Sequence, residues 1–164
     1  MQLILCGRWF GKKVFYEAEI EDVKFYKSLD NIGEISPLSF AIFSYHLSSE
    51  TLNLNIKKPN LPAVVVVKIK KFRKITQKFI NTRLIIRGKA LQDEEFKARI
   101  LQIKGFIEKG IVYQINLTNR FDFKIHGDPL SVFFNFYKNQ PVPSAFFLNA
   151  GDFFIISGSM ELFL

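Results

Sequence analysis

Hydrophobic and polar residues follow one another in short runs through the first half of the chain, a pattern that predicts β-strands. The runs are rich in Val, Ile, Phe and Tyr, and residues that favour turns separate them. We therefore predict strands at residues 3–5, 13–16, 38–45, 52–56, 63–69 and 83–86. Residues 22–29 are predicted to form a short helix.

Residues 93–109 have the clearest helical period in the chain. Four apolar residues recur at spacings of four, three and four and form one stripe: Phe96, Ile100, Ile103 and Ile107. Acidic residues at 93–95 suit the positive N-terminal end of a helix, and Gly110 is a natural C-terminal stop. Gly105 in the middle of this helix predicts close packing against a sheet.

After Gly110 the period changes from helical to two, which predicts a strand at residues 111–118 with one apolar face. The opposite face carries two amides and a hydroxyl, where a solvent-facing strand would more often carry Lys or Glu. Gln114 and Asn116 are therefore candidates for binding a ligand in a cavity. The alternative is an amide pair whose hydrogen bonds are satisfied within the core.

A second helix and a hairpin complete the predicted order of elements. Asp128 is placed to cap a helix with Pro129 at its first position, continuing through residues 130–139. Strands at 145–149 and 153–157 are joined by a turn at 149–152. We predict an α+β fold in a single domain, residues 1–164. Residues 1–91 are mostly strands, and residues 92–164 form a helix, strand, helix and hairpin.

Composition narrows the class of protein. A chain of 164 residues, 48% hydrophobic and with 19 Phe, is suited to one domain with a core and excludes a disordered protein. No apolar run approaches the roughly 18 to 20 residues that a membrane helix needs, so we expect no membrane span. The single cysteine, Cys6, cannot form an internal disulfide, which predicts a buried, inert thiol and a reduced, cytoplasmic setting.

The net charge of +8 is concentrated in the first 91 residues, which hold 16 Lys and Arg against 7 Asp and Glu. The excess centres on residues 68–78, where Phe72 and Phe79 interrupt a basic run. Basic residues can neutralise phosphates and aromatic rings can stack on bases, so a non-catalytic nucleic-acid-binding module is one hypothesis. The alternative is a solvated face of a strand or helix.

Few residues have the spacing that catalysis or metal binding requires. His46 and His126 lack further ligands at metal-binding spacing, so we predict structural or surface roles and no metal site. Glu161 is different, because Met160, Leu162 and Phe163 flank it at the end of an apolar strand. Poor solvation there would raise the pKa of its carboxyl group toward a value useful to a general acid. The alternative is an edge glutamate that faces water.

The segment from Phe96 to Leu164 resembles the chorismate-utilising enzymes, in particular component I of aminodeoxychorismate synthase (para-aminobenzoate synthase). The blocks "GIVYQINLTNRF", "DPL" and "PSAFFLNAGDFFIISGSMELFL" occur in the family's order and spacing. The Asn-Leu-Thr sequence at 116–118 resembles the aminodeoxychorismate branch, whereas the anthranilate branch tends to carry Val-Pro-Ser there. Residues 40–45 and 59–62 resemble further family segments upstream.

The resemblance implies a fold and a reaction. The fold would be the N-terminal part of the anthranilate synthase component I-like fold, with layered antiparallel sheets and packed helices. In the reaction, a glutamine amidotransferase partner supplies ammonia, which is added to chorismate bound with Mg2+ on the route to para-aminobenzoate and folate. Glu161 would be the general acid that helps the ring hydroxyl depart. Gln114 and Asn116 would lie in the catalytic cavity, and Pro143, Ser144 and Ala145 on a segment that lines a tryptophan pocket.

The chain also departs from the family pattern. Met160 replaces a proline before Glu161, and Ile111 replaces an aspartate. The family's Ile-Lys-Gly-Thr segment with its nucleophilic lysine, and the glutamates that hold Mg2+, do not occur in these residues. We therefore expect a truncated or split synthase component, inactive alone, that needs a complementary C-terminal polypeptide. A fragment similar to anthranilate synthase component I is the alternative within the family.

Overall fold

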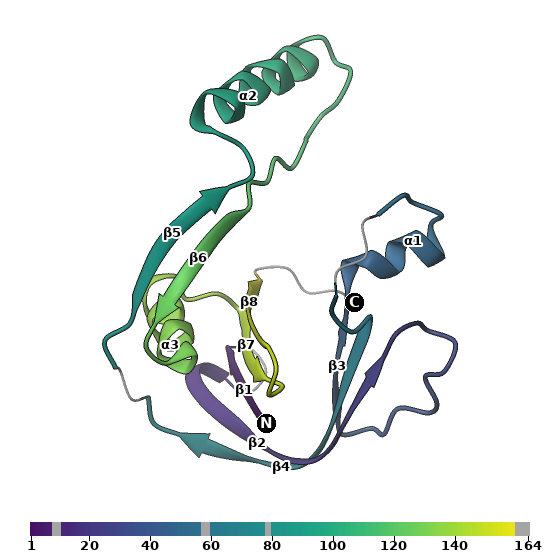
Figure 1. The fold of residues 1–164 in the computed structure, drawn as a ribbon, viewed down its shortest axis with the longest axis vertical. Helices are drawn as coiled ribbons and strands as arrows, with labels where there is room; N and C mark the ends of the chain where they lie inside the picture. The colour runs from purple at the N-terminus through teal and green to yellow at the C-terminus, as the bar shows by residue number, and fades with distance from the viewer. Residues whose placement is uncertain (8–10, 57–59, 78–79, 160–164) are drawn as a thin grey trace. The chain divides into compact units, whose positions relative to one another are not determined.

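The computed structural model describes residues 1–7, 11–56, 60–77 and 80–159. The chain divides into two compact units (Figure 1). Unit 1 comprises Met1–Phe79 and Phe133–Leu164, and unit 2 comprises Ile80–Val132. Each unit is described by itself.

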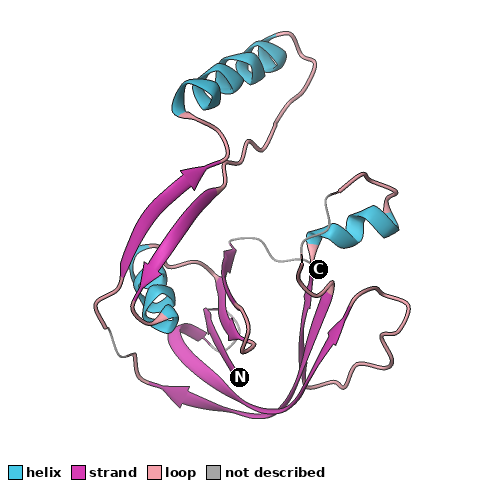
Figure 2. Cartoon of the chain, in the orientation of Figure 1, coloured by secondary structure: helices cyan, strands magenta, loops and turns pink. Residues whose placement is uncertain are grey.

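Unit 1 is built on a six-stranded antiparallel sheet with the strand order β3-β4-β2-β1-β7-β8 (Figure 2). Its strands are β1 (Gln2–Gly7), β2 (Gly11–Tyr26), β3 (Ser39–Phe43), β4 (Val64–Ile75), β7 (Ser144–Asn149) and β8 (Phe154–Ser159). The long strands β2 and β4 bend strongly, so the sheet is curled (Figure 1). This confirms the predicted α+β class with an antiparallel sheet.

Strand β2 is much longer than its local pattern suggests. It pairs with β4 from Phe15 opposite Ile75 to Tyr26 opposite Val64, with a register shift around Ile20. The helix predicted at residues 22–29 is therefore wrong, because residues 22–26 are strand. The backbone hydrogen bonds of this segment go to a strand some forty residues away, a pairing that no short sequence window contains.

The strand predicted at residues 52–56 is also wrong. The chain instead forms a 3₁₀ turn, η1 (Tyr45–Leu47), and one helical turn, α1 (Ser48–Thr51), after which residues 53–56 are irregular. The hydroxyl of Ser49 donates to the carbonyl of His46, and that of Thr51 donates to the carbonyl of Leu47. Such local bonds offer the backbone an alternative to a strand ladder.

Strand β1 is buried on both faces of the curled sheet. Successive residues of β1 point to opposite faces, and all of Leu3–Cys6 are 3% exposed or less. One face holds a cluster of apolar residues drawn from four strands and the β7–β8 turn: Leu3, Leu5, Ala18, Val65, Val67, Ile69, Leu148 and Ala150. Phe40 and Phe146 close this cluster, with their ring centroids 5.0 Å apart.

Helix α3 (Pro129–Asn139) covers the other face through its residues from Phe133 onward. The ring of Phe15 on β2 meets Phe133, Phe134 and Tyr137 edge to face, at centroid distances of 5.9, 5.1 and 5.3 Å. Such pairs add about 0.5 to 1.5 kcal/mol each beyond the burial of their area. The predicted cap is confirmed, because the carboxylate of Asp128 accepts from the backbone N–H groups of Leu130 and Ser131.

Unit 2 consists of a two-stranded antiparallel ribbon, β5 (Arg83–Lys89) with β6 (Phe121–His126), and the helix α2 (Asp93–Glu108). The predicted helix is confirmed. The strand predicted at residues 111–118 is wrong, because this segment is irregular, and β6 takes its place beside β5. Asn119 joins the two ends of the segment between β5 and β6. Its side chain accepts from the N–H of Leu91 and donates to the carbonyl of Leu91, both at 2.9 Å.

Burial in unit 2 differs from burial in unit 1. Of the described residues 80–132, only Ser131 is buried, and no apolar side chain is. The stripe of α2 is partly exposed, and no atom lies within 4 Å of the position that a Cβ on Gly105 would occupy. The predicted packing of a sheet on Gly105 is therefore wrong within this unit. No helix among the described residues combines the length and apolar character that crossing a membrane demands.

Substitution of Gly7 by Ala is expected to destabilise the protein by about 3 kcal/mol or more. Gly7 has a positive φ of 94°, and a Cβ there would overlap the carbonyl group of Pro143. Urea denaturation followed by circular dichroism measures the change. Gly33→Ala is the matched control, because no atom lies within 4 Å of the added Cβ. Equal midpoints for the two variants would contradict this account of Gly7.

Hydrogen exchange should divide the chain into two classes of amide. Amides of β1 and β7 lie in ladders covered on both faces and are expected to exchange only on global unfolding. Amides of β5, β6 and α2 are expected to exchange orders of magnitude faster, because no apolar side chain of unit 2 is buried. Exchange followed by mass spectrometry gives both rates in one experiment, and uniform protection would refute the expectation.

Candidate functional site

The polar residues predicted to line a cavity lie on the irregular segment of unit 2. Gln114 and Asn116 are both exposed, and the amide nitrogen of Gln114 lies 3.4 Å from the amide oxygen of Asn116. Their neighbour Tyr113 is 97% exposed. Both side chains are therefore open to solvent within unit 2. The role of Gln114 and Asn116 in substrate binding stays a prediction.

The residues predicted to line a tryptophan pocket lie in unit 1, where β7 begins. Ser144 pairs with Gly7 on one side and Ser159 on the other, and Ala145 pairs with Cys6 and is 1% exposed. None of Pro143, Ser144 and Ala145 lines a described pocket. Their assignment stays a prediction, as does that of Glu161, which lies outside the described residues.

The approach of α3 and the 141–143 turn to the sheet fixes the local geometry around β7 and β8. A Cβ on Gly158 would lie 2.7 Å from Phe136 and 2.8 Å from Val142. The absence of a side chain at Gly7 likewise lets the Pro143 carbonyl approach β1. Two glycines thus allow this turn to lie directly on the sheet.

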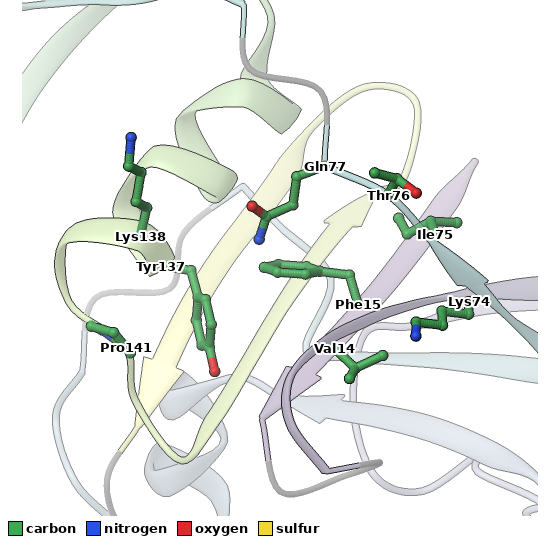
Figure 3. A pocket seen from close by; sticks show the side chains of 9 residues that line it. All are labelled: Val14, Phe15, Lys74, Ile75, Thr76, Gln77, Tyr137, Lys138 and Pro141. Atoms are coloured by element: carbon green, nitrogen blue, oxygen red, sulfur yellow. The ribbon is translucent and has the colours of Figure 1, made fainter.

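A cavity of about 540 Å³ opens in unit 1, between the start of β2, the end of β4 and the C-terminal end of α3 (Figure 3). The rings of Phe15 and Tyr137 form one wall, and Lys74 and Lys138 are its charged residues. The other lining residues are Val14, Ile75, Thr76, Gln77 and Pro141. The sequence did not predict this cavity, because its residues come from three distant segments that share no motif.

Acidic residues of the neighbouring strand pair with part of the basic run. Lys68 pairs with Glu21 at 2.6 Å, Lys71 with Glu19 at 3.3 Å, and the Nε of Arg73 with Glu17 at 2.9 Å. Lys71 and Arg73 lie directly opposite their partners across β2 and β4, whereas Glu21 lies at a register shift beside Asp22, the residue opposite Lys68. The result is a cross-strand ladder of alternating charge, which supports the solvated-face interpretation of the run rather than a continuous anion-binding stripe.

The two histidines have the predicted structural and surface places. His46 is buried, and its Nδ1 lies 2.7 Å from the hydroxyl of Ser44, whereas His126 is exposed on β6. Among the described residues no three His, Cys, Asp or Glu side chains are grouped so as to hold a metal ion.

Two comparisons with known proteins bear on the chain. The model of a protein family described as chorismate binding enzyme matches residues 19–164. No curated protein matches the chain significantly. The matched region contains every residue to which the sequence assigned a site role.

Cys6 should lower the stability of the protein selectively at high pH. Burial raises the pKa of its thiol above the ordinary value of 9.0, against weaker opposing effects of hydrogen bonds with Tyr137 and Gly7. The unfolded chain loses this proton first, so the stability contributed by Cys6 is complete below pH 9.0 and is lost as the pH rises.

Urea denaturation between pH 8 and pH 10.5 tests this expectation, with Cys6→Ala as the comparison. The wild type should lose stability more steeply than the variant above about pH 9. A thiol reagent should also react with the native protein only at the rate of unfolding, because Cys6 is fully buried. Parallel pH profiles of the two proteins, or rapid labelling of the native thiol, would contradict the buried neutral thiol.

Proposed function

Because the chain belongs to the chorismate binding enzyme family, we propose that it acts as part of an aminodeoxychorismate synthase, component I. In the proposed reaction an amino group derived from ammonia replaces a ring hydroxyl of chorismate and gives 4-amino-4-deoxychorismate. The leaving hydroxyl departs as water after accepting a proton. The product leads to para-aminobenzoate and folate.

The observation that carries the proposal is the family match over residues 19–164 together with the order of motifs inside it. Within the family, the Asn-Leu-Thr block at residues 116–118 favours the aminodeoxychorismate branch over the anthranilate branch. The order of structural elements supports the same proposal. Helix α2, the 111–118 segment, helix α3 and the β7–β8 hairpin follow one another as the motifs require.

Six residues have proposed roles. Glu161 is the general acid that protonates the departing hydroxyl, because its sequence neighbours are apolar and it matches the family's acidic position. Gln114 and Asn116 bind substrate through their side-chain amides, which can both donate and accept hydrogen bonds. Pro143, Ser144 and Ala145 belong to a segment that binds tryptophan in the family, and we propose a structural role for them here.

The proposed activity needs groups beyond the described residues. Ammonia comes from a glutamine amidotransferase partner. The 164 residues contain no Ile-Lys-Gly-Thr segment, and among the described residues no three His, Cys, Asp or Glu side chains are grouped to hold a metal ion. In the proposed enzyme a further polypeptide segment supplies these groups. No step is assigned to the metal.

Nucleic-acid binding by the basic run is not favoured. Binding through phosphate neutralisation requires cations that can exchange their counterions for phosphates. Here Lys68, Lys71 and Arg73 already lie against carboxylates of β2. Anthranilate synthesis is the stronger alternative function. The nutrient that a deletion strain requires for growth distinguishes it from aminodeoxychorismate synthesis.

Deletion of the coding gene in the host cell is expected to create a requirement for para-aminobenzoate that tryptophan does not relieve. Because the test uses the cell's own partners, it does not depend on activity of the isolated chain. A Glu161→Gln allele should reproduce the requirement, since glutamine keeps the size of the side chain and cannot donate a carboxyl proton. A Glu108→Gln allele, which changes an exposed carboxylate at the end of α2, is the control and should grow normally.

Two results would overturn the proposal. A requirement for tryptophan alone would place the chain in the anthranilate branch. Normal growth of the deletion strain without either supplement would remove the chain from both syntheses. If only the Glu161→Gln allele grew normally, the branch would stand and the role of Glu161 as the acid would be wrong.

A further inference from the structure

We propose that the cavity of unit 1 binds small anionic aromatic molecules, namely a flat ring that carries a carboxylate and no ammonium group. The site uses none of the residues assigned to chorismate chemistry, so it stands apart from the proposed function. Three properties of the cavity carry the proposal: its size, its aromatic wall and the sign of its charges.

The size and wall suit one planar ring. A volume of about 540 Å³ falls within the range of about 300 to 1,000 Å³ that is typical of small-molecule sites. Phe15 and Tyr137 meet edge to face with their centroids 5.3 Å apart, and both are at least 95% buried. Their packing against the sheet and α3 fixes the wall before a ligand arrives. Val14, Ile75 and Pro141 extend the apolar lining.

Among the polar groups of the lining, the amide of Gln77 lies beside the aromatic wall. Figure 3 shows this side chain directed toward the ring of Phe15, from the segment that follows β4. The amide can bond a polar substituent of a ring. An apolar cavity with a small number of placed polar groups is the usual composition of a ligand site.

The charges of the lining select the ligand. Lys74 and Lys138 are cationic, and none of the described residues that line the cavity is acidic. Glu17, the nearest carboxylate along β2, already accepts from both Arg73 and the side-chain amide of Gln2. A carboxylate therefore meets cationic groups at this site, whereas an ammonium group meets no carboxylate among the described lining residues and faces two like charges. The site should discriminate against an amino acid, although an amino acid has the same ring and carboxylate.

Three indole compounds that differ only in charge test the proposal by calorimetry and ligand-observed NMR. Indole-3-propionate carries the carboxylate alone, tryptophan carries both charges, and tryptamine carries the ammonium group alone. Indole-3-propionate should bind tightest, with a Kd about fivefold or more below that of tryptophan. Tryptamine should show no binding, and the affinity of indole-3-propionate should fall as salt is added. Tryptophan or tryptamine binding as well as indole-3-propionate would overturn the proposal, and so would the absence of binding by all three.

Substitutions then locate the binding. Lys74→Met and Lys138→Met should each weaken indole-3-propionate about fivefold and leave tryptophan nearly unchanged. Both lysines are exposed, so these variants keep the core intact, and circular dichroism verifies the fold. Lys104→Met on α2, an exposed lysine of unit 2, is the matched control and should not alter binding. Equal affinities of the Lys74, Lys138 and Lys104 variants would refute the assignment to this cavity.

Discussion

The pairing of β1 with both β2 and β7 is the constraint on which the rest of unit 1 depends. It joins residues 2–7, at the start of the chain, to residues 144–149, which follow the whole of unit 2 in sequence. Leu3 and Leu5 contribute to one buried face, while Ile4 and Cys6 are buried on the other. A strand that is apolar on both faces can be stable only between two layers. On the face of Leu3 and Leu5, residues of β4 from the curled part of the sheet cover the strand. On the other face, α3 covers it.

The cavity follows from the same pairing. Cys6 on β1 lies opposite Phe15 on β2 and Ala145 on β7, so the three strands present one surface to α3. Phe15 then fixes the helix through three edge-to-face contacts. The cavity lies at the end of this interface, beside Phe15 and Tyr137. Its aromatic wall is therefore a part of the core that lines the cavity.

Elements defined by local chemistry could be predicted from the sequence, and elements defined by distant partners could not. The period of α2, the Asp128 cap of α3 and the turn before β8 each lie within a short window. The length of β2, by contrast, depends on β4, and the position of β6 depends on β5. The cavity draws on residues 14–15, 74–77 and 137–141, so only the tertiary structure could reveal it.

The candidate site residues also show what a local pattern cannot predict. Family resemblance pointed to Gln114 and Asn116, but the strand that would have aimed them into a cavity is absent. The alternation at residues 111–118 is real, yet alternation fixes a strand only when a neighbouring strand and an apolar surface are present. The described residues of unit 2 supply neither for this segment.

Unit 2 shows that an apolar face in the sequence pattern does not by itself mean that the face is buried. In the ribbon, Leu84 lies opposite Ile125 and Ile86 opposite Phe123, so these four side chains share one face. On the reverse face Arg83 lies opposite His126. The ribbon therefore has an apolar face that remains largely exposed, with Ile86 59% exposed and Phe123 47%.

Local interactions alone leave the helix of unit 2 marginal, and its apolar stripe is partly exposed. Ion pairs of Glu94 with Lys97 and of Glu95 with Arg99 each contribute only a few tenths of a kcal/mol. A helix of 16 residues is marginal on such terms, because most helical stability in proteins comes from packing of the apolar face. The contacts within unit 2 do not provide that packing. The segment that carries Gln114 and Asn116 follows directly from this helix, and it is likewise mostly exposed.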